Sequence, residues 1–176
     1  MDVASNLFST QGYNLTGINQ IIKESGIARA TLYHHFKSKT ELLVAYLQKA
    51  DERMFEELEN FLISIDDPRQ KLLALIDYRL QRQLKLGFKG CRFVKVSLEI
   101  CAEEEQKVVE ITNAHKAKFK NLIGELVAGA NRRQLLNDDL MTETIFLLLE
   151  GSTVNGTLTR SPAALKKTKK IVETLL

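Results

Sequence analysis

The sequence predicts an all-α protein with a small N-terminal head and a larger C-terminal body. Apolar residues recur three and four positions apart along most of the 176 residues, the spacing that gathers side chains on one face of a helix. The only two prolines, Pro68 and Pro162, each stand where a helical pattern begins. We therefore expect a three-helix head in residues 1–46 and a helical body in residues 47–176.

The head contains a helix-turn-helix pattern. Isoleucines in Ile18–Ile22 are spaced three and four apart, and we expect Thr16 to cap the helix that they predict. Gly26 can adopt the left-handed backbone that ends one helix and leads into the next. Apolar residues then continue through Ile27–Phe36, which predicts the second helix of the pair.

Further helices are expected on either side of this pair. Apolar residues in Met1–Thr10 predict a short supporting helix. Ser38–Glu41 reads S-K-T-E, a capping box in which a hydroxyl and a carboxylate satisfy backbone amides at a helix start. A long amphipathic helix follows from Lys39 to Leu62. Because it joins head and body, we expect it to transmit tilt between them.

The open side of the second helix carries the candidate groove-facing residues. Arg29, Ala30, Tyr33 and His34 lie on or beside it, and Lys39 begins the following helix. Arginine can reach a guanine edge through two hydrogen bonds, and the other polar side chains can bind phosphate oxygens. Helical hairpins with a merely solvated polar face share this spacing, so spacing alone leaves both interpretations open.

A long, ordered set of residues runs through the head: Gly12, Tyr13, Thr16, Ile18, Ile21, Gly26, Thr31, Leu32, Tyr33, His35, Phe36, Ser38, Lys39, Glu41 and Leu42. This set resembles the N-terminal signature of the TetR family of bacterial transcriptional regulators. The strong match covers about the first quarter of the chain, and the remainder resembles the family only in helix layout.

The resemblance implies that the helix over Arg29–Phe36 enters the major groove of double-stranded DNA. It assigns contacts with DNA to Thr16, Arg29, Ala30, Thr31, Tyr33, His34 and Lys39. By the same resemblance, Thr16, Tyr33 and Lys39 hold phosphates, whereas Arg29, Ala30 and His34 lie near bases.

The head departs from the family pattern in three ways. Two of them, Ala28 and the lack of a basic arm, support an alternative, an α-helical ligand-binding or interaction protein with weakened DNA binding. Ala28 stands where a hydroxyl residue usually caps the recognition helix, and losing a cap costs about 0.5–2 kcal/mol. Ala30 stands where glycine is common. No basic arm precedes the first helix in this sequence. The resemblance implies that such an arm adds phosphate or minor-groove contacts, so either the affinity for DNA is reduced or N-terminal residues are absent from this sequence.

The body is expected to contain five more helices. Asp67–Pro68 predicts a helix start that continues to about Leu86, and glycines then break the pattern. The apolar run Phe93–Cys101 predicts a short helix. Glu103–Glu105 is expected to begin a long helix, and Asp138–Asp139 to cap the next. Ser161 and Pro162 open the last helix.

The last two helices are expected to pair with a second copy of the chain. The apolar residues of Met141–Leu158 and of the final helix exceed what the surface of one subunit usually shows, and the resemblance also implies a four-helix homodimer interface. We assign this interface to Ile145, Leu148, Leu149, Ser152, Leu165 and Val172. The alternative is that both helices pack only within their own body.

A small-molecule pocket is expected within the body. Such pockets are mostly apolar with few polar groups, so we expect an uncharged or aromatic effector. The candidate lining residues are Tyr78, Arg79, Arg82, Phe88, Cys91, Phe93, Phe119 and Phe146, although each aromatic residue also suits an ordinary core. Cys91 lies next to Arg92 between two helices, so a thiol that senses electrophiles or oxidants is a second hypothesis.

The composition excludes several other classes of function. No phosphate-binding glycine loop, G-x-S-x-G or C-x-x-C motif occurs, so we predict no enzyme and no cofactor. The spacing of Cys91, Cys101 and His115 matches no recognisable zinc site, so we predict no metal. No apolar run is long enough for a membrane span and no signal peptide is evident, which predicts a cytoplasmic protein.

The charge pattern limits how this chain could bind DNA. The net charge of +3 requires a local binding surface, repeated in a dimer, rather than a generally basic body. A lysine cluster within Lys166–Lys170 offers a second polyanion site, but we interpret it as the solvated side of the last helix.

Overall fold

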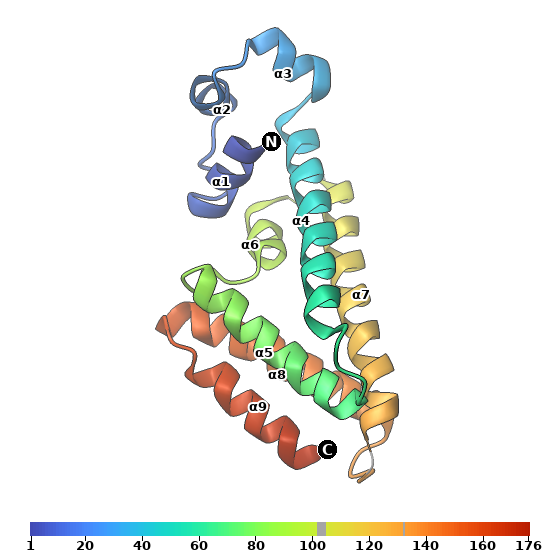
Figure 1. Cartoon of the computed structure of the whole chain (residues 1–176). Coiled ribbons are helices and arrows are strands. Elements are labelled where there is room, and N and C mark those ends of the chain that lie inside the picture. Colours follow the sequence, from blue (N-terminus) through green and yellow to red (C-terminus); the bar gives the residue numbers. More distant parts are fainter. Residues whose placement is uncertain (102–104, 132) are drawn as a thin grey trace. The chain divides into compact units, whose positions relative to one another are not determined.

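A computed structural model describes residues 1–101, 105–131 and 133–176 of the chain. Within these ranges it contains nine helices and no strand (Figure 1), which confirms the predicted all-α class. The helices are α1 Asp2–Thr10, α2 Ile18–Ser25, α3 Arg29–His35, α4 Lys39–Leu62, α5 Pro68–Lys85, α6 Arg92–Glu99, α7 Gln106–Ala130, α8 Asp138–Thr159 and α9 Ala163–Leu175.

The chain forms two compact units. The first unit comprises Met1–Arg53 and Arg92–His115, and the second comprises Met54–Cys91 and Lys116–Leu176. Both α4 and α7 contribute residues to each unit. None of the helices in the described part of the chain combines the length and apolar character that a membrane span requires.

The first unit contains the predicted helix-turn-helix, formed by α2 and α3. Gly26 ends α2 with φ of 67°, a left-handed conformation that glycine adopts without a steric penalty. Below the pair, α1 buries an aromatic side chain, Phe8, whose ring centroid lies 5.7 Å from that of Tyr13 and 5.6 Å from that of Tyr46. These rings join α1 to the long helix α4.

The helix starts in the first unit agree only partly with the sequence prediction. Ser38 accepts a hydrogen bond from the Glu41 amide at 3.0 Å, while the Glu41 carboxylate accepts one from the Lys37 amide at 2.7 Å, so the capping box forms with its return bond one residue earlier. Ala28 begins α3 without a side-chain cap, as its methyl group requires. The prediction that Thr16 caps α2 is wrong, because Gly17 occupies that position.

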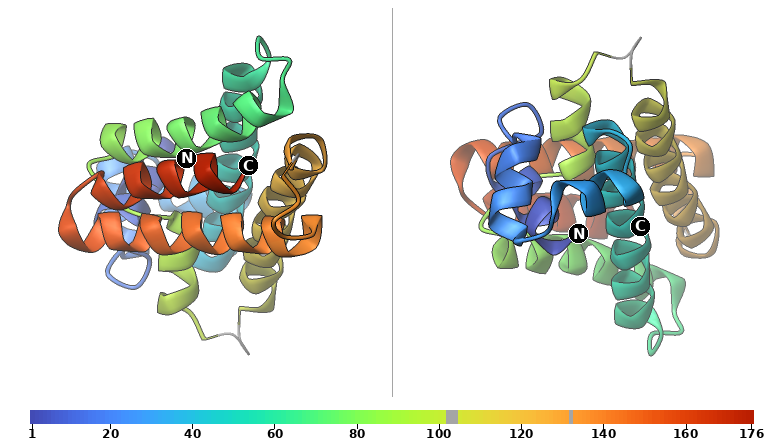
Figure 2. Two further views of the ribbon diagram at one scale, coloured as in Figure 1. Left: turned by 90° about the horizontal axis from the view of Figure 1, so that it is seen from below. Right: turned by 90° about the horizontal axis from the view of Figure 1, so that it is seen from above.

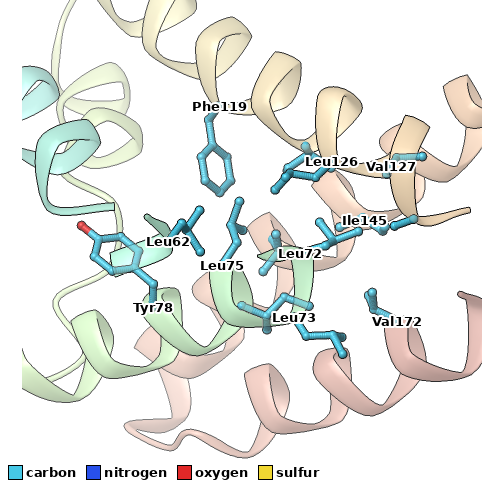
Figure 3. Packing of buried hydrophobic residues seen from close by; sticks show 14 of the residues in the cluster. Leu62, Leu72, Leu73, Leu75, Tyr78, Phe119, Leu126, Val127, Ile145 and Val172 are labelled. Atoms are coloured by element: carbon cyan, nitrogen blue, oxygen red, sulfur yellow. The ribbon is translucent and has the colours of Figure 1, made fainter. Parts of the chain in front are cut away.

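In the second unit, α9 packs against both α5 and α8, and the three helices lie side by side in Figure 1 and in the left view of Figure 2. Apolar side chains from these helices and from α4 and α7 fill the core, and Figure 3 shows part of it. The fully buried members include Leu72, Leu75, Phe119, Ile123, Met141, Ile145 and Leu149.

Capping residues define the helix starts of the second unit. The Asp67 carboxylate accepts a bond from the Gln70 amide at 2.9 Å, which confirms the predicted start of α5. The prediction that Asp138–Asp139 caps α8 is wrong by one residue, because Asn137 accepts the bond from the Leu140 amide. The predicted acidic start of α7 falls partly outside the described residues, and α7 begins directly after Glu105.

Candidate nucleic-acid interface

The helix α3 exposes the residues that the sequence assigns to DNA. Leu32 is its buried anchor, whereas Arg29, Ala30, Thr31, Tyr33 and His34 are all exposed. Tyr33 retains 40% of its accessible surface, so it is open to solvent. The exposed polar side of α3 is therefore available to a partner.

Arg29 is oriented by a residue that the sequence analysis did not single out. Its Nη2 donates to the Asn19 side-chain oxygen, and Asn19 lies on α2, ten residues earlier. Both side chains are exposed, so the pair fixes the direction of the guanidinium without removing it from solvent. The only hint of this role in the sequence is that Asn19 is a polar residue at the second position of α2.

Lys39 lies at the N-terminus of α4, with its ammonium 4.1 Å from the centroid of the Tyr13 ring. Partial burial lowers the pKa of Lys39 because it disfavours the charged form, while the carboxylates of Glu99 and Glu105 act in the opposite direction. The lysine is positioned by an aromatic ring at a helix N-terminus, where backbone amides also favour an anion.

Tyr13 supports this lysine from a buried position. Its hydroxyl donates to Glu105 Oε1 at 3.1 Å, and the Thr40 hydroxyl donates to the same oxygen at 3.0 Å. Burial raises the pKa of the Tyr13 hydroxyl, so it stays protonated and able to donate at neutral pH. The ring below Lys39 is therefore held by hydrogen bonds within the first unit.

Thr16 occupies a different environment from the other candidate DNA residues. Its side chain is fully buried, and its hydroxyl donates to the Gly12 carbonyl at 2.6 Å. It also accepts a bond from Gln11 at 3.3 Å. Thr16 thus holds the turn before α2 in the described conformation.

A cavity of about 410 Å³ lies behind α3 in the first unit. It is lined mainly by apolar side chains from α1 to α4: Met1, Val3, Ala4, Ile21, Ser25, Ile27, Thr31, Leu32, His35, Phe36 and Leu42. Its lining includes exposed residues such as Ile27 and Thr31, so it opens at the surface, and α3 buries only Leu32 among its residues.

The candidate effector residues fall into separate groups. Tyr78 and Arg82 both contact the Glu57 carboxylate, and burial raises the pKa of the Tyr78 hydroxyl. Phe119 is fully buried, whereas Phe146 is partly buried against the same core.

The remaining candidates lie elsewhere. Phe88 has a left-handed backbone, with φ of 57°, and its ring lies near Gly156. Lys116 Nζ lies 3.6 Å from Cys91 Sγ in the second unit. Phe93 belongs to the first unit, where its ring stacks on His115 at 3.6 Å.

Most of the candidate dimer residues point into the second unit. Five of them are buried there: Ile145, Leu149, Ser152, Leu165 and Val172. Leu148 is partly buried. The apolar side chains that face outward from α8 and α9 are instead Leu140, Leu147, Val154, Leu158 and Ile171, with exposed fractions from 45% to 77%.

No group of three potential metal-binding His, Cys, Asp or Glu side chains lies together among the residues that the structure describes. The charged and hydroxyl groups near α3 instead form a local set of hydrogen-bond donors on the surface of the first unit. Donors of this kind suit the phosphates and base edges of nucleic acid.

Comparisons with known proteins connect this surface to a family. Residues 1–46 match the family described as "Bacterial regulatory proteins, tetR family". The HTH-type transcriptional activator FasR of Mycolicibacterium smegmatis is 34% identical over 74 residues, which are 42% of this chain and 34% of that protein. The chain spans about a third to two fifths of the length of the first curated relatives it matches. These relatives are transcriptional regulators rather than enzymes, the class that the sequence predicts.

Solved structures show the same fold over nearly the whole chain. The crystal structure of SCO4454, a TetR-family transcriptional regulator from Streptomyces coelicolor, has a TM-score of 0.85 at 23% identity and covers 99% of this chain and 84% of its own. A chain described as a transcriptional regulator from Saccharomonospora viridis, in complex with choline, has a TM-score of 0.82 at 18% identity, covering 98% and 91%.

Proposed function

We propose that this chain, which belongs to the TetR family of bacterial transcriptional regulators, is a repressor that binds a palindromic operator as a homodimer. In this proposal, residues 1–46 form the DNA-binding domain and residues 47–176 bind an effector and form the dimer. A small molecule bound in the body releases the protein from the operator. Because the proposed target is bacterial DNA, we propose that the protein acts in the cytoplasm.

The exposed face of α3 carries this proposal. Its exposed residues surround one buried leucine, and the exposed Arg29 guanidinium donates to Asn19 on α2. We assign Arg29, Ala30 and His34 to base edges in the major groove, and Tyr33 and Lys39 to phosphates, with Thr31 on the same face. Thr16 can donate to a phosphate only if its hydroxyl gives up the hydrogen bond that it donates to the Gly12 carbonyl.

The outward-facing apolar residues of α8 and α9 support a homodimer. Leu147, Val154 and Leu158 are seven and four positions apart, so they follow one face of α8, and Ile171 is exposed on α9. Two copies joined there would bury these side chains. They would also present two α3 helices to successive major grooves about 34–36 Å apart.

The homodimer can be tested by light scattering at micromolar concentration. We expect twice the chain mass of 20.0 kDa for the unmodified protein. Leu158→Asp should shift the species toward the monomer, because a carboxylate on an apolar contact is costly to desolvate. Leu84→Asp, an exposed leucine on α5, is the matched control and should stay dimeric. A stable 20.0 kDa species for the unmodified chain would contradict the proposed homodimer.

A small-molecule effector follows from the same fold. A structural neighbour holds choline, which supports a ligand site in proteins of this shape. In this chain the effector would favour a body conformation in which the two α3 helices no longer match the groove spacing. Only a difference in its affinity for the two conformations is needed.

Thiol sensing through Cys91 is a second candidate, favoured by the ammonium of Lys116 close to its sulfur. A neighbouring cation favours attack by a cysteine on an electrophile. We expect Cys91→Ser to abolish release of the operator by a quinone, while Cys101→Ser leaves it intact. Unchanged release from the Cys91 variant would exclude this trigger.

Weakened DNA binding is the alternative from a different class, favoured by the missing cap at Ala28. Selection of bound duplexes from a randomised pool, at moderate salt and with the full chain, separates the two. A DNA reader enriches a palindrome with two equal half-sites. If no sequence is enriched, the chain is better described as a ligand-binding protein whose head no longer reads DNA.

A further inference from the structure

The second unit encloses a cluster of charged residues from three helices. Arg79 on α5 is only 5% exposed, and its Nη2 lies 3.3 Å from Glu150 Oε1 on α8. The other oxygen of Glu150 contacts the ammonium of Lys116 on α7. A single carboxylate is thus shared by two cations.

The cluster carries an excess positive charge in a poorly solvated place. Arg79 and Lys116 contribute two positive charges and Glu150 one negative charge, and the side chains of Lys116 and Glu150 are each only 20% exposed. The other described ion pairs of this unit have their own carboxylates: Arg82 with Glu57, Lys120 with Glu143, and Lys169 with Asp77. An uncompensated buried charge is strongly destabilising, so a protein rarely keeps one without a partner.

Arg79 also has an unused hydrogen-bond donor. Its Nη2 donates to Glu150 and, at 3.2 Å, to the Thr153 hydroxyl, but its buried Nε has no partner among the described residues. Leaving a buried donor unpaired is costly, and more so when the donor belongs to a charged group. An additional anion would balance the excess positive charge of the cluster and accept a hydrogen bond from the Arg79 Nε.

The surroundings of the cluster indicate what kind of anion fits. The Arg79 guanidinium stands 4.9 Å from the centroid of the Phe119 ring, and Phe119 and Leu149 are fully buried. Figure 3 shows Phe119 directed from α7 toward the apolar core. A ligand that reaches Arg79 therefore needs an apolar part as well as a negative group.

We propose that the Arg79–Lys116–Glu150 cluster binds the carboxylate of an amphipathic organic acid, and that the effector of this regulator belongs to that class. The assignment rests on the proposed function, since it names the chemistry of the effector in the body. The sequence led us to expect an uncharged or aromatic effector, and this proposal differs from that expectation in giving the effector a negative charge. The carboxylate would balance the excess charge and accept the free Nε–H, while its hydrocarbon part contacts the apolar wall.

Two matched pairs of probes test this proposal: octanoate against octanamide, and benzoate against benzamide, below the micellar range at constant ionic strength. Each pair has nearly the same shape and differs in charge. Isothermal titration of the full chain should show at least one carboxylate binding 10-fold or more tightly than its amide. Equal affinity for the carboxylate and the amide in both pairs, or no detectable binding in either, would overturn the proposal. So would a rise in melting temperature with sodium chloride equal to the rise with the carboxylate probes at the same concentration.

Variants of the cluster make the test specific. Arg79→Gln should abolish the preference for the carboxylate, and Lys116→Gln should reduce it. Glu150→Gln removes the shared carboxylate, so the carboxylate probe should raise the melting temperature of this variant more than that of the unmodified protein. If Arg79→Gln does not fold, the other two variants decide. An unchanged preference in Lys116→Gln together with an unchanged thermal shift in Glu150→Gln would contradict the site.

The DNA response is measured separately, by operator release with the same probes. Binding of the carboxylate without release supports the anion site and contradicts control of the operator from the body. Release by the amides as strongly as by the carboxylates supports an effector-controlled regulator and contradicts the assigned ligand class.

Discussion

The helices α3 and α8 differ in how firmly the rest of their own unit holds them. Leu32 is the buried residue of α3, which starts without a side-chain cap and lies over a cavity of about 410 Å³. By contrast, α8 is capped by Asn137 and has Met141, Ile145 and Leu149 fully buried. A helix whose side chains are mostly exposed, as we propose for the DNA-reading helix α3, gives up the contacts that would stabilise it, whereas a core helix keeps them.

The largest expected effect on stability comes from truncating a buried side chain of α8. Ile145→Ala should lower the free energy of unfolding by roughly 2–5 kcal/mol, because it removes a fully buried side chain and leaves a cavity. Leu84→Ala, at an exposed position of α5, should change it by less than about 0.5 kcal/mol. Urea denaturation measures both. Equal losses would show that α8 is not held as described.

A smaller effect should follow from adding the cap that α3 lacks. Ala28→Ser places a hydroxyl where it can accept an amide hydrogen of the first turn, and we expect stabilisation of about 0.5–2 kcal/mol. Ala30→Ser is the control. Ala30 is the second residue of α3, where a hydroxyl cannot act as the N-cap, so this change should not stabilise the helix. Hydrogen exchange of the α3 amides reports the change directly. Faster exchange in Ala28→Ser would contradict the assigned helix start.

Filling the cavity behind α3 should have the smallest effect. Val3→Leu adds one methylene group to the lining, worth about 0.8 kcal/mol if it is fully buried. Thermal denaturation should show a slight rise in the melting temperature. A fall would mean that the side chain does not enter the cavity and that α3 is already close-packed.

Local chemistry made much of the fold predictable from the sequence. Gly26, the capping box at Ser38 and the Asp67–Pro68 start are short-range signals. The structure confirms the first and the third, and it forms the capping box with its return bond at Lys37. The cap of α8 was misplaced because Asn137 and the following aspartates are all good caps, and sequence alone does not rank neighbours.

The parts that depend on long-range packing could not be predicted in the same way. Apolar residues occupy every position from Ile145 to Leu149, so their spacing did not separate the buried side of α8 from the exposed one. The cluster of Arg79, Lys116 and Glu150 joins residues that are far apart in the chain. Its excess charge becomes visible only when three helices are brought together.

The most direct test of DNA reading by α3 compares two variants, because we assign Arg29 to bases and Lys39 to a phosphate. Affinities for the selected operator and for a scrambled duplex should be measured by fluorescence anisotropy across a range of salt concentrations. We expect Arg29→Ala to lower the ratio of the two affinities by roughly 5- to 150-fold, equivalent to about 1–3 kcal/mol. Lys39→Ala should weaken both duplexes alike and reduce the salt slope by about 1. Undiminished discrimination by the Arg29 variant would contradict the assignment of α3 as the reading helix.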